Sequence, residues 1–428
     1  MIRLLRLTCL LLIFATKLSF ASVDFDTYFE NKTLRVDYLL GGNANEQTVF
    51  LQQIKKESFW GGTTKNLVDS FNYGNFRFKL IDKASETLIY SRGFGSLFQE
   101  WQATPEAKTL NRSYYQVNVM PFPKHKAQFV IDYRNRDGVY VKLFEYEINP
   151  ENYFILEEKA MDVKSSKLMG KGKASESIDI AFVAEGYTQE EMGKFRADVE
   201  RIAGYVLNVE PFKSYADRFN IYALESVSED SGPDIPGQHI YKNTVLNSTF
   251  YTFDSERYLT TSDLKTMHDI AANVPYDHIF VLINTDKYGG AGIYNYYTSC
   301  ASDHKLSREV ASHEFGHGFV GLADEYYNDS VSVEDFYNLK VEPWEPNITT
   351  LVDFDRKWKS MLEKGIVTPT PRTEEYEGKV GLFEGGGYMS KGMFSPVMDC
   401  KMKTNNKDEF CPVCQKACER MIRFTIGE

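Results

Sequence analysis

Between residues 33 and 146, apolar and polar residues alternate along the chain, as they do in Leu34–Tyr38, Phe76–Leu80 and Val139–Leu143. A period of two residues is typical of strands that bury one face. Glycine-rich turns separate these segments, and a series of short strands with turns between them favours an all-β sandwich. We therefore predict a β-sandwich domain over residues 22–160.

The pattern changes further along, where strands begin to alternate with helices. The segment Ile178–Val183 is typical of a buried strand, and Thr188–Glu191 is a capping box that opens a helix. Apolar residues then recur at steps of three and four, at Met192, Phe195, Val199, Ile202 and Val206. Two more strands are predicted at Phe219–Leu224 and His278–Ile283. These elements predict an α/β domain over residues 161–428, joined to the sandwich by a solvated connection of Lys, Ser and Gly residues at Asp162–Glu176.

The first 21 residues have the composition of a leader. Arg3 and Arg6 precede the apolar run Leu7–Ala15, and the small residues Ser19 and Ala21 suit cleavage before Ser22. The apolar run is too short to span a bilayer. We expect residues 1–21 to be a signal peptide and the protein to be exported, to a periplasmic or extracellular location, with no stable membrane span after cleavage.

The charge excludes one class of partner. Removal of the leader leaves 46 basic and 60 acidic residues, a formal charge of −14. Such a surface repels nucleic acid, so no nucleic-acid partner is expected. Nothing in the sequence defines an oligomeric state.

Five cysteines follow the leader: Cys300, Cys400, Cys411, Cys414 and Cys418. In an oxidising compartment the last four favour one or two disulfides near the C-terminus. The alternative is a structural zinc site made by these four, because Cys411 and Cys414 have the spacing of metal ligands.

The sequence His313-Glu314-Phe315-Gly316-His317 carries candidate chemistry. Residues four apart share a helix face, so His313 and His317 can bind one metal while Glu314 lies beside it as a base. Zinc accepts nitrogen ligands and keeps one position open for water in catalytic sites. The competing interpretation is a surface helix with two histidines. The glycines that crowd this segment argue against it, because they would weaken an ordinary helix.

A third ligand is required, and Asp324 and Glu325 follow shortly after. Gly321 can end the helix and return the chain to the metal, so Asp324 is our first choice. Glu325 stays open as the ligand, and so does a role for either carboxylate as hydrogen-bond acceptor for a ligand histidine.

Three further segments have weaker signals. Met398 could underlie the metal as a methionine turn or be an ordinary core residue. Tyr388 could donate a hydrogen bond to the oxyanion of a tetrahedral intermediate. The segment Tyr288–Gly292 lacks the residues of a nucleotide loop, and an edge strand with a flexible loop that lines a substrate cleft fits it better.

The residues from His313 to Tyr326 resemble the signature HExxHxxxGLxDEY of the immunoglobulin A metallopeptidase family, and every defined position matches. The similarity extends to Phe182–Thr188, where Glu185 stands in place of an expected aspartate, to Tyr288-Gly289-Gly290, and to Phe410–Cys414. The resemblance implies a zincin-like α/β catalytic domain, often preceded by a β-sandwich, with His313 and His317 as zinc ligands and Glu314 as catalytic acid/base. It does not imply cleavage of immunoglobulin A.

The sequence thus predicts a secreted zinc endopeptidase with one catalytic Zn²⁺, for which protein or peptide substrates are expected, host or environmental glycoproteins among them. An exported glycan- or protein-binding module with an inactive or structural zinc domain is the alternative from another class. Hydrolysis of a non-peptide amide, such as a cell-wall link, would use the same site and differ only in substrate.

Overall fold

The computed structural model describes residues 23–157, 161–327 and 337–428. The predicted signal peptide lies outside these residues. None of the helices in the described part has the length and apolarity that a membrane span requires.

The N-terminal region is mostly β, as its alternating pattern predicted. Two antiparallel sheets form, with strand orders β2-β1-β5 and β4-β3-β6-β7. Inward residues of both sheets, such as Leu34, Phe78 and Phe129, share one hydrophobic core. The elements of this region are α1 (Phe25–Tyr28), β1 (Phe29–Gly42), β2 (Gln47–Glu57), β3 (Phe76–Asp82), β4 (Leu88–Phe94), α2 (Leu97–Gln102), β5 (Arg112–Pro123), β6 (Ala127–Arg134) and β7 (Tyr140–Ile148).

The second region is built on a six-stranded mixed sheet with the order β12-β13-β11-β9-β10-β8. The four central strands are parallel, and both edge strands run antiparallel to their neighbours. Its elements are β8 (Lys164–Met169), β9 (Ile178–Glu185), α3 (Met192–Leu207), β10 (Phe219–Glu225), α4 (Leu264–Ala271), β11 (His278–Ile283), β12 (Gly290–Ile293), β13 (Tyr297–Ala301), α5 (Ser307–Phe315), β14 (Phe383–Gly386), β15 (Met389–Ser395) and α6 (Pro412–Thr425).

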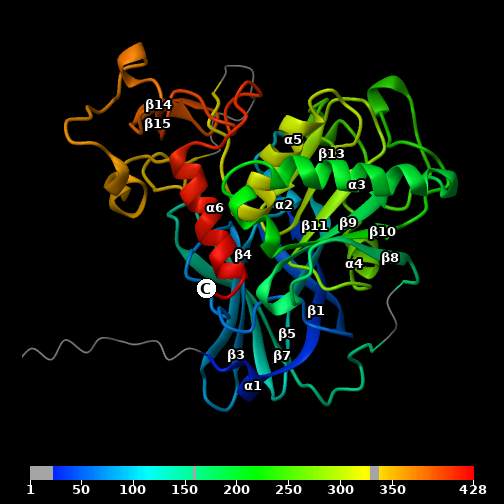
Figure 1. Ribbon diagram of the computed structural model, residues 1–428. Helices are drawn as coiled ribbons and strands as arrows, with labels where there is room; N and C mark the ends of the chain where they lie inside the picture. Colours follow the sequence, from blue (N-terminus) through cyan, green and yellow to red (C-terminus); the bar gives the residue numbers. More distant parts are fainter. Residues whose placement is uncertain (1–22, 158–160, 328–336) are drawn as a thin grey trace, which may run out of the picture.

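Helices cover both faces of this sheet (Figure 1). Side chains of α3, α5 and α6 share a core with one face of β9, where Ile180 and Phe182 point. The opposite face, with Ala181 and Val183, packs against α4 and the N-terminal region. Strand β9 is buried at every position because it has covered faces on both sides.

One expectation about the connection between the regions was wrong. The Lys- and Ser-rich segment was predicted to be a solvated connection, but Lys164–Met169 forms strand β8 and pairs with β10. Its polarity reflects its place at the sheet edge, where charged side chains discourage pairing with other chains.

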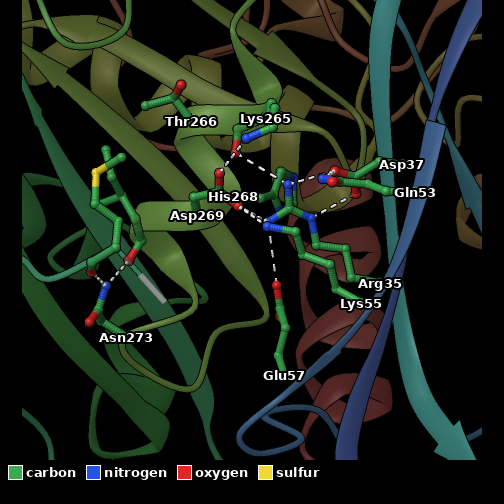
Figure 2. A network of polar contacts seen from close by, with 12 residues as sticks. Arg35, Asp37, Gln53, Lys55, Glu57, Lys265, Thr266, His268, Asp269 and Asn273 are labelled. Atoms are coloured by element: carbon green, nitrogen blue, oxygen red, sulfur yellow. Dashed lines mark hydrogen bonds and ion pairs between the residues drawn. The ribbon is translucent and has the colours of Figure 1, made fainter. Parts of the chain in front are cut away.

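A buried ion-pair network joins the two regions (Figure 2). Arg35 on β1 is fully buried and donates to both oxygens of Asp37, at 2.7 and 2.8 Å. Its Nη1 also donates to Asp269 of α4 at 2.7 Å, and Lys55 Nζ donates to the same oxygen at 2.9 Å. Burial alone would raise the pKa of Asp269, but Arg35 and Lys55 outweigh burial and lower it to about 2. Buried ion pairs therefore hold the N-terminal sheet to α4, and breaking them would cost several kcal/mol of unfolding free energy, roughly 3 to 5.

Candidate metal centre

The two motif histidines lie on different kinds of helical turn. His313 is in the last turn of α5, and His317 is in the π-helical turn Gly316–Val320 that follows. The sequence predicted one α-helix for both. Glycines at 316 and 318 weaken the α-helical preference, and π-turns of this kind occur frequently at functional sites.

The glycines of β12 allow the motif to lie directly against the sheet. A Cβ at Gly292 would come within 2.1 Å of the Glu314 carbonyl oxygen, and one at Gly290 within 3.0 Å of Glu314 Cγ. Strand β12 is one of the two edge strands of the sheet, as the sequence suggested. Its outer side is partly occupied, because Gly290 forms a bridge with Tyr258.

Gly321 turns the chain back toward the histidines, as predicted. It has φ 78° and ψ 31°, in the left-handed region that favours glycine. Its amide donates to the His317 carbonyl at 3.0 Å, and Leu322 N donates to the Gly316 carbonyl at 3.1 Å. This turn brings Asp324 to the two imidazoles.

Three side chains meet at one point. The Nε2 atoms of His313 and His317 are 3.0 Å apart, and Asp324 Oδ1 lies 3.1 and 3.2 Å from them. His313 Nδ1 faces the Lys401 carbonyl at 2.9 Å, and His317 Nδ1 faces the Leu322 carbonyl at 2.6 Å. Because a carbonyl oxygen only accepts, each Nδ1 donates, and a neutral ring then presents its Nε2 lone pair to the centre.

Three converging lone pairs require a positive charge between them. Burial would lower the pKa of His317, but the Asp324 carboxylate outweighs burial and raises it to about 9. Burial would likewise raise the pKa of Asp324, yet His317 and His313 hold it well below its usual range. The positive charge is a proton or a metal ion, and this nitrogen and oxygen donor set suits a metal such as zinc.

Glu314 lies beside this group on the same helix. Its side chain is half-buried. Burial raises the pKa of Glu314, and the neighbouring His313 and His317 offset part of that rise. A carboxyl group with a raised pKa next to a metal position is suited to take up and release a proton.

Glu325 does not join the histidines. Its side chain points to a different cluster, formed with Cys400, Cys411 and Cys414. All five cysteines of the described chain have free thiols, so the preferred expectation of disulfides is not met. Cys418, which the alternative zinc site included, lies outside the cluster, and Glu325 takes its place.

The two C-terminal candidates have other contacts than those expected. Tyr388 OH donates to Asp324 Oδ2 at 2.5 Å, so in this structure its hydroxyl supports a carboxylate. The methionine that packs against the motif is Met402, whose Sδ would lie 3.0 Å from a Cβ at Gly316. Its carbonyl accepts from Glu325 N at 2.7 Å. The sequence pointed to Met398, whose carbonyl instead accepts a hydrogen bond from Arg372 at 3.1 Å.

Sequence reasoning missed three residues near the centre. Glu100 comes from α2 of the N-terminal region and accepts a hydrogen bond from Tyr258 OH. Burial raises the pKa of Glu100 to about 7 although Tyr258 and His317 lower it in part. Arg257 is exposed and donates to Tyr326 OH at 3.2 Å. These contacts join segments far apart in sequence, and no local pattern signals them.

Glu185 occupies the position where the family resemblance led us to expect an aspartate, and its carboxylate holds a neighbouring loop by hydrogen bonds. Its fully buried carboxylate accepts from the amides of Leu246 and Ser248, both at 2.9 Å, and from the Thr244 hydroxyl at 2.5 Å. It thereby fixes the loop that precedes α4.

Two imidazoles and a carboxylate that converge beside a further carboxyl group have the donor set of a metallopeptidase. The model of the family described as IgA Peptidase M64 matches residues 167–376 and 372–422, and that described as Peptidase M64 N-terminus matches residues 24–145. The chain belongs to the IgA peptidase M64 family. It is therefore a metallopeptidase, with a metal ion as cofactor and protein as substrate. A comparison with curated proteins found none that matches the chain.

Proposed function

We propose that the chain is an exported zinc endopeptidase with a zincin-like catalytic domain behind an N-terminal β-sandwich. His313, His317 and Asp324 hold the zinc, and Glu314 is the catalytic acid/base. The observation that carries this proposal is the convergence of the two Nε2 atoms and Asp324 Oδ1 within 3.2 Å of one another, with both Nδ1 atoms committed to carbonyls.

A zinc ion at this point would lower the pKa of a bound water molecule and polarise the carbonyl of the peptide bond. The side chains and backbone of the protein orient the ligands and transfer the proton. Tyr388 and the two carbonyls orient the ligand side chains, so the donor atoms need little rearrangement on binding. Glu314 takes a proton from the attacking water and delivers it to the leaving amine. Its raised pKa favours holding that proton between the two steps.

The substrate is proposed to be a folded or extended protein, with glycoproteins of a host or of the surroundings as the class to test first. The exposed Arg257 beside Tyr326 supports recognition of carbonyl or acidic groups near the cut bond. The family alone does not make immunoglobulin A the substrate, because specificity depends on contacts in the cleft.

The test compares the zinc-loaded protein with Glu314→Gln on a mixed-protein substrate, with cleavage sites identified by mass spectrometry. Loss of general acid/base catalysis lowers turnover by about 10² to 10⁴. The variant is expected to keep its zinc content and melting temperature. Full turnover in Glu314→Gln, with contaminating peptidases excluded, would contradict the assignment.

The same digestion separates this proposal from an exported binding module. A wild-type protein that carries zinc in the histidine centre and cleaves no protein would favour the binding module. Export is tested by the N-terminal sequence of protein recovered outside the cytoplasm, where Ser22 is expected as the first residue. A chain that keeps residues 1–21 would contradict cleavage.

A further inference from the structure

A second group of possible ligands lies apart from the histidines. One carboxylate oxygen of Glu325 and the Sγ atoms of Cys400, Cys411 and Cys414 all lie within 4.8 Å of one another. Glu325 Oε1 is 3.1 Å from Cys414 Sγ, and the Sγ atoms of Cys400 and Cys414 are 3.9 Å apart. All four side chains are buried, with at most 5% of any residue exposed.

Backbone amides donate to two of the sulfurs and offset part of the cost of burying them as thiolates. Cys411 is the N-cap of α6 and its Sγ accepts from the amide of Cys414 at 3.5 Å. The Cys411 amide in turn donates to Cys400 Sγ at 3.2 Å. Amide donors and a helix N-terminus both stabilise a thiolate, which is the form that binds metal.

Charged groups beside the cluster lack the partners that burial demands. Glu325 Oε2 is buried with no hydrogen-bond partner among the described residues, while Asn347 Nδ2 donates to its Oε1 at 3.0 Å. The buried Nζ of Lys403 likewise has no hydrogen-bond partner among the residues that the structure describes. A buried carboxylate with one unpaired oxygen is costly, as is a buried thiolate, and a bound cation removes that cost.

We propose that Glu325, Cys400, Cys411 and Cys414 form a structural zinc site, separate from the histidine centre. Four donors match the tetrahedral preference of zinc, and Cys411-x-x-Cys414 has the spacing of structural ligands. The protein fills all four positions and leaves none for water, so the site stabilises the fold and performs no hydrolysis. Binding displaces the three thiol protons to solvent. Lys403 then offsets part of the negative charge of the assembled site.

A disulfide is the main competing state in an oxidising compartment. A bond between Cys400 and Cys414 would draw their Sγ atoms from 3.9 Å to about 2.05 Å. It would remove the contact between the Cys414 thiol and Glu325 Oε1 and would leave Glu325 Oε2 buried without a hydrogen-bond partner among the described residues. Zinc binding satisfies all four groups at once, which is why the cluster favours it.

The first experiment measures zinc per chain in the purified full-length protein by elemental mass spectrometry. The wild type is expected to bind two zinc ions, and Cys414→Ser to lose one of them. Cys418→Ser is the matched control, since Cys418 is also fully buried on α6 but lies outside the cluster. It is expected to keep both ions. A wild-type protein with one zinc, removed by substitution at the histidine centre, would overturn the proposal.

The second experiment uses the wild type, so it does not depend on whether a variant folds. Replacement of zinc by Co²⁺ is expected to give an intense thiolate-to-cobalt absorption in the near ultraviolet, which the nitrogen and oxygen donors of the histidine centre cannot produce. Absence of that band would overturn the proposal. Detection of a Cys400–Cys414 disulfide by peptide mapping without reductant would do the same.

Discussion

Asp324 and Glu325 are neighbours in the chain, yet their carboxylates belong to different clusters. Asp324 Oδ1 lies 3.1 Å from His313 Nε2, while Glu325 Oε1 lies 3.1 Å from Cys414 Sγ. Both residues lie in a segment outside the helices and strands, and this one stretch of backbone serves both groups. Substitution of Asp324 is therefore expected to affect the histidine centre, and substitution of Glu325 is expected to affect the cysteine cluster.

Asp324→Ala is expected to abolish hydrolysis and to release the ion of the histidine centre. Loss of a direct ligand should weaken zinc binding by more than the roughly 10- to 100-fold typical of supporting residues. The ion proposed at the cysteines should stay. Zinc analysis and a peptide-cleavage assay check this, and unchanged hydrolysis by Asp324→Ala would exclude it as a ligand.

Tyr388→Phe removes the hydrogen bond to Asp324 Oδ2 and leaves the ring in place. Zinc affinity at the histidine centre or activity should fall by about 10- to 100-fold. Competition with a chelator measures the affinity. The matched control is Tyr140→Phe in the N-terminal region, where the hydroxyl donates to the Tyr73 carbonyl at 2.8 Å. Equal effects of the two substitutions would show that Tyr388 does not act through Asp324.

Gly292→Ala is expected to displace the motif from β12. The added Cβ would lie 2.1 Å from the Glu314 carbonyl oxygen and 2.8 Å from His317 Cβ. Overpacking of this kind costs about 1 to 3 kcal/mol of unfolding free energy, and activity should fall further because the ligands move. Gly204→Ala in α3 is the control, since nothing lies within 4 Å of its Cβ position. That substitution should stabilise the protein by about 0.5 to 1 kcal/mol.

Glu100 makes stability depend on pH. Burial raises its pKa to about 7 from the ordinary value of 4.5, so between these two pH values the folded state holds a proton that the unfolded state has lost. The unfolding free energy should therefore fall as pH rises from 4.5 to 7. With allowance for its partial exposure to water, the loss is about 1 to 2 kcal/mol. In Glu100→Gln this part of the pH dependence should vanish, as denaturant unfolding at several pH values would show. An unchanged slope would exclude Glu100 as its source.

Arg35→Ala should loosen the junction between the regions. It leaves Asp37 without its buried cation and removes one of the cations that pair with Asp269, and breaking such a network costs about 3 to 5 kcal/mol. Thermal unfolding measures the loss. Lys359→Ala breaks an exposed pair with Asp355 and should change stability by no more than about 0.5 kcal/mol. A similar small change in Arg35→Ala would contradict the structural importance of the network.

Local sequence was enough to find most of the histidine centre. The four-residue spacing selected His313 and His317, and a glycine with positive φ explained why Asp324 could reach them. The alternation of polar and apolar residues likewise predicted the β character of the N-terminal region. In these cases the determining contacts lie within a few residues of one another.

Contacts between distant segments could not be predicted in this way. The Lys401 carbonyl, Tyr388 and Glu100 reach the centre only through the tertiary fold. The cysteine spacing suggested a metal site, but the fourth ligand chosen from sequence was Cys418, and the fold supplies Glu325 instead. Strand β8 was missed because an exposed edge strand has the polar composition of a linker.

The bond between His313 Nδ1 and the Lys401 carbonyl spans 88 residues of chain and has a consequence for timing. Synthesis proceeds from the N-terminus, so the motif is made long before the residue that orients its first imidazole. Helix α6, which packs against the π-helical turn, is made later still. A nascent chain thus carries the complete motif without a complete centre. The three donor atoms are therefore expected to reach their final arrangement only after α6 has packed against the turn.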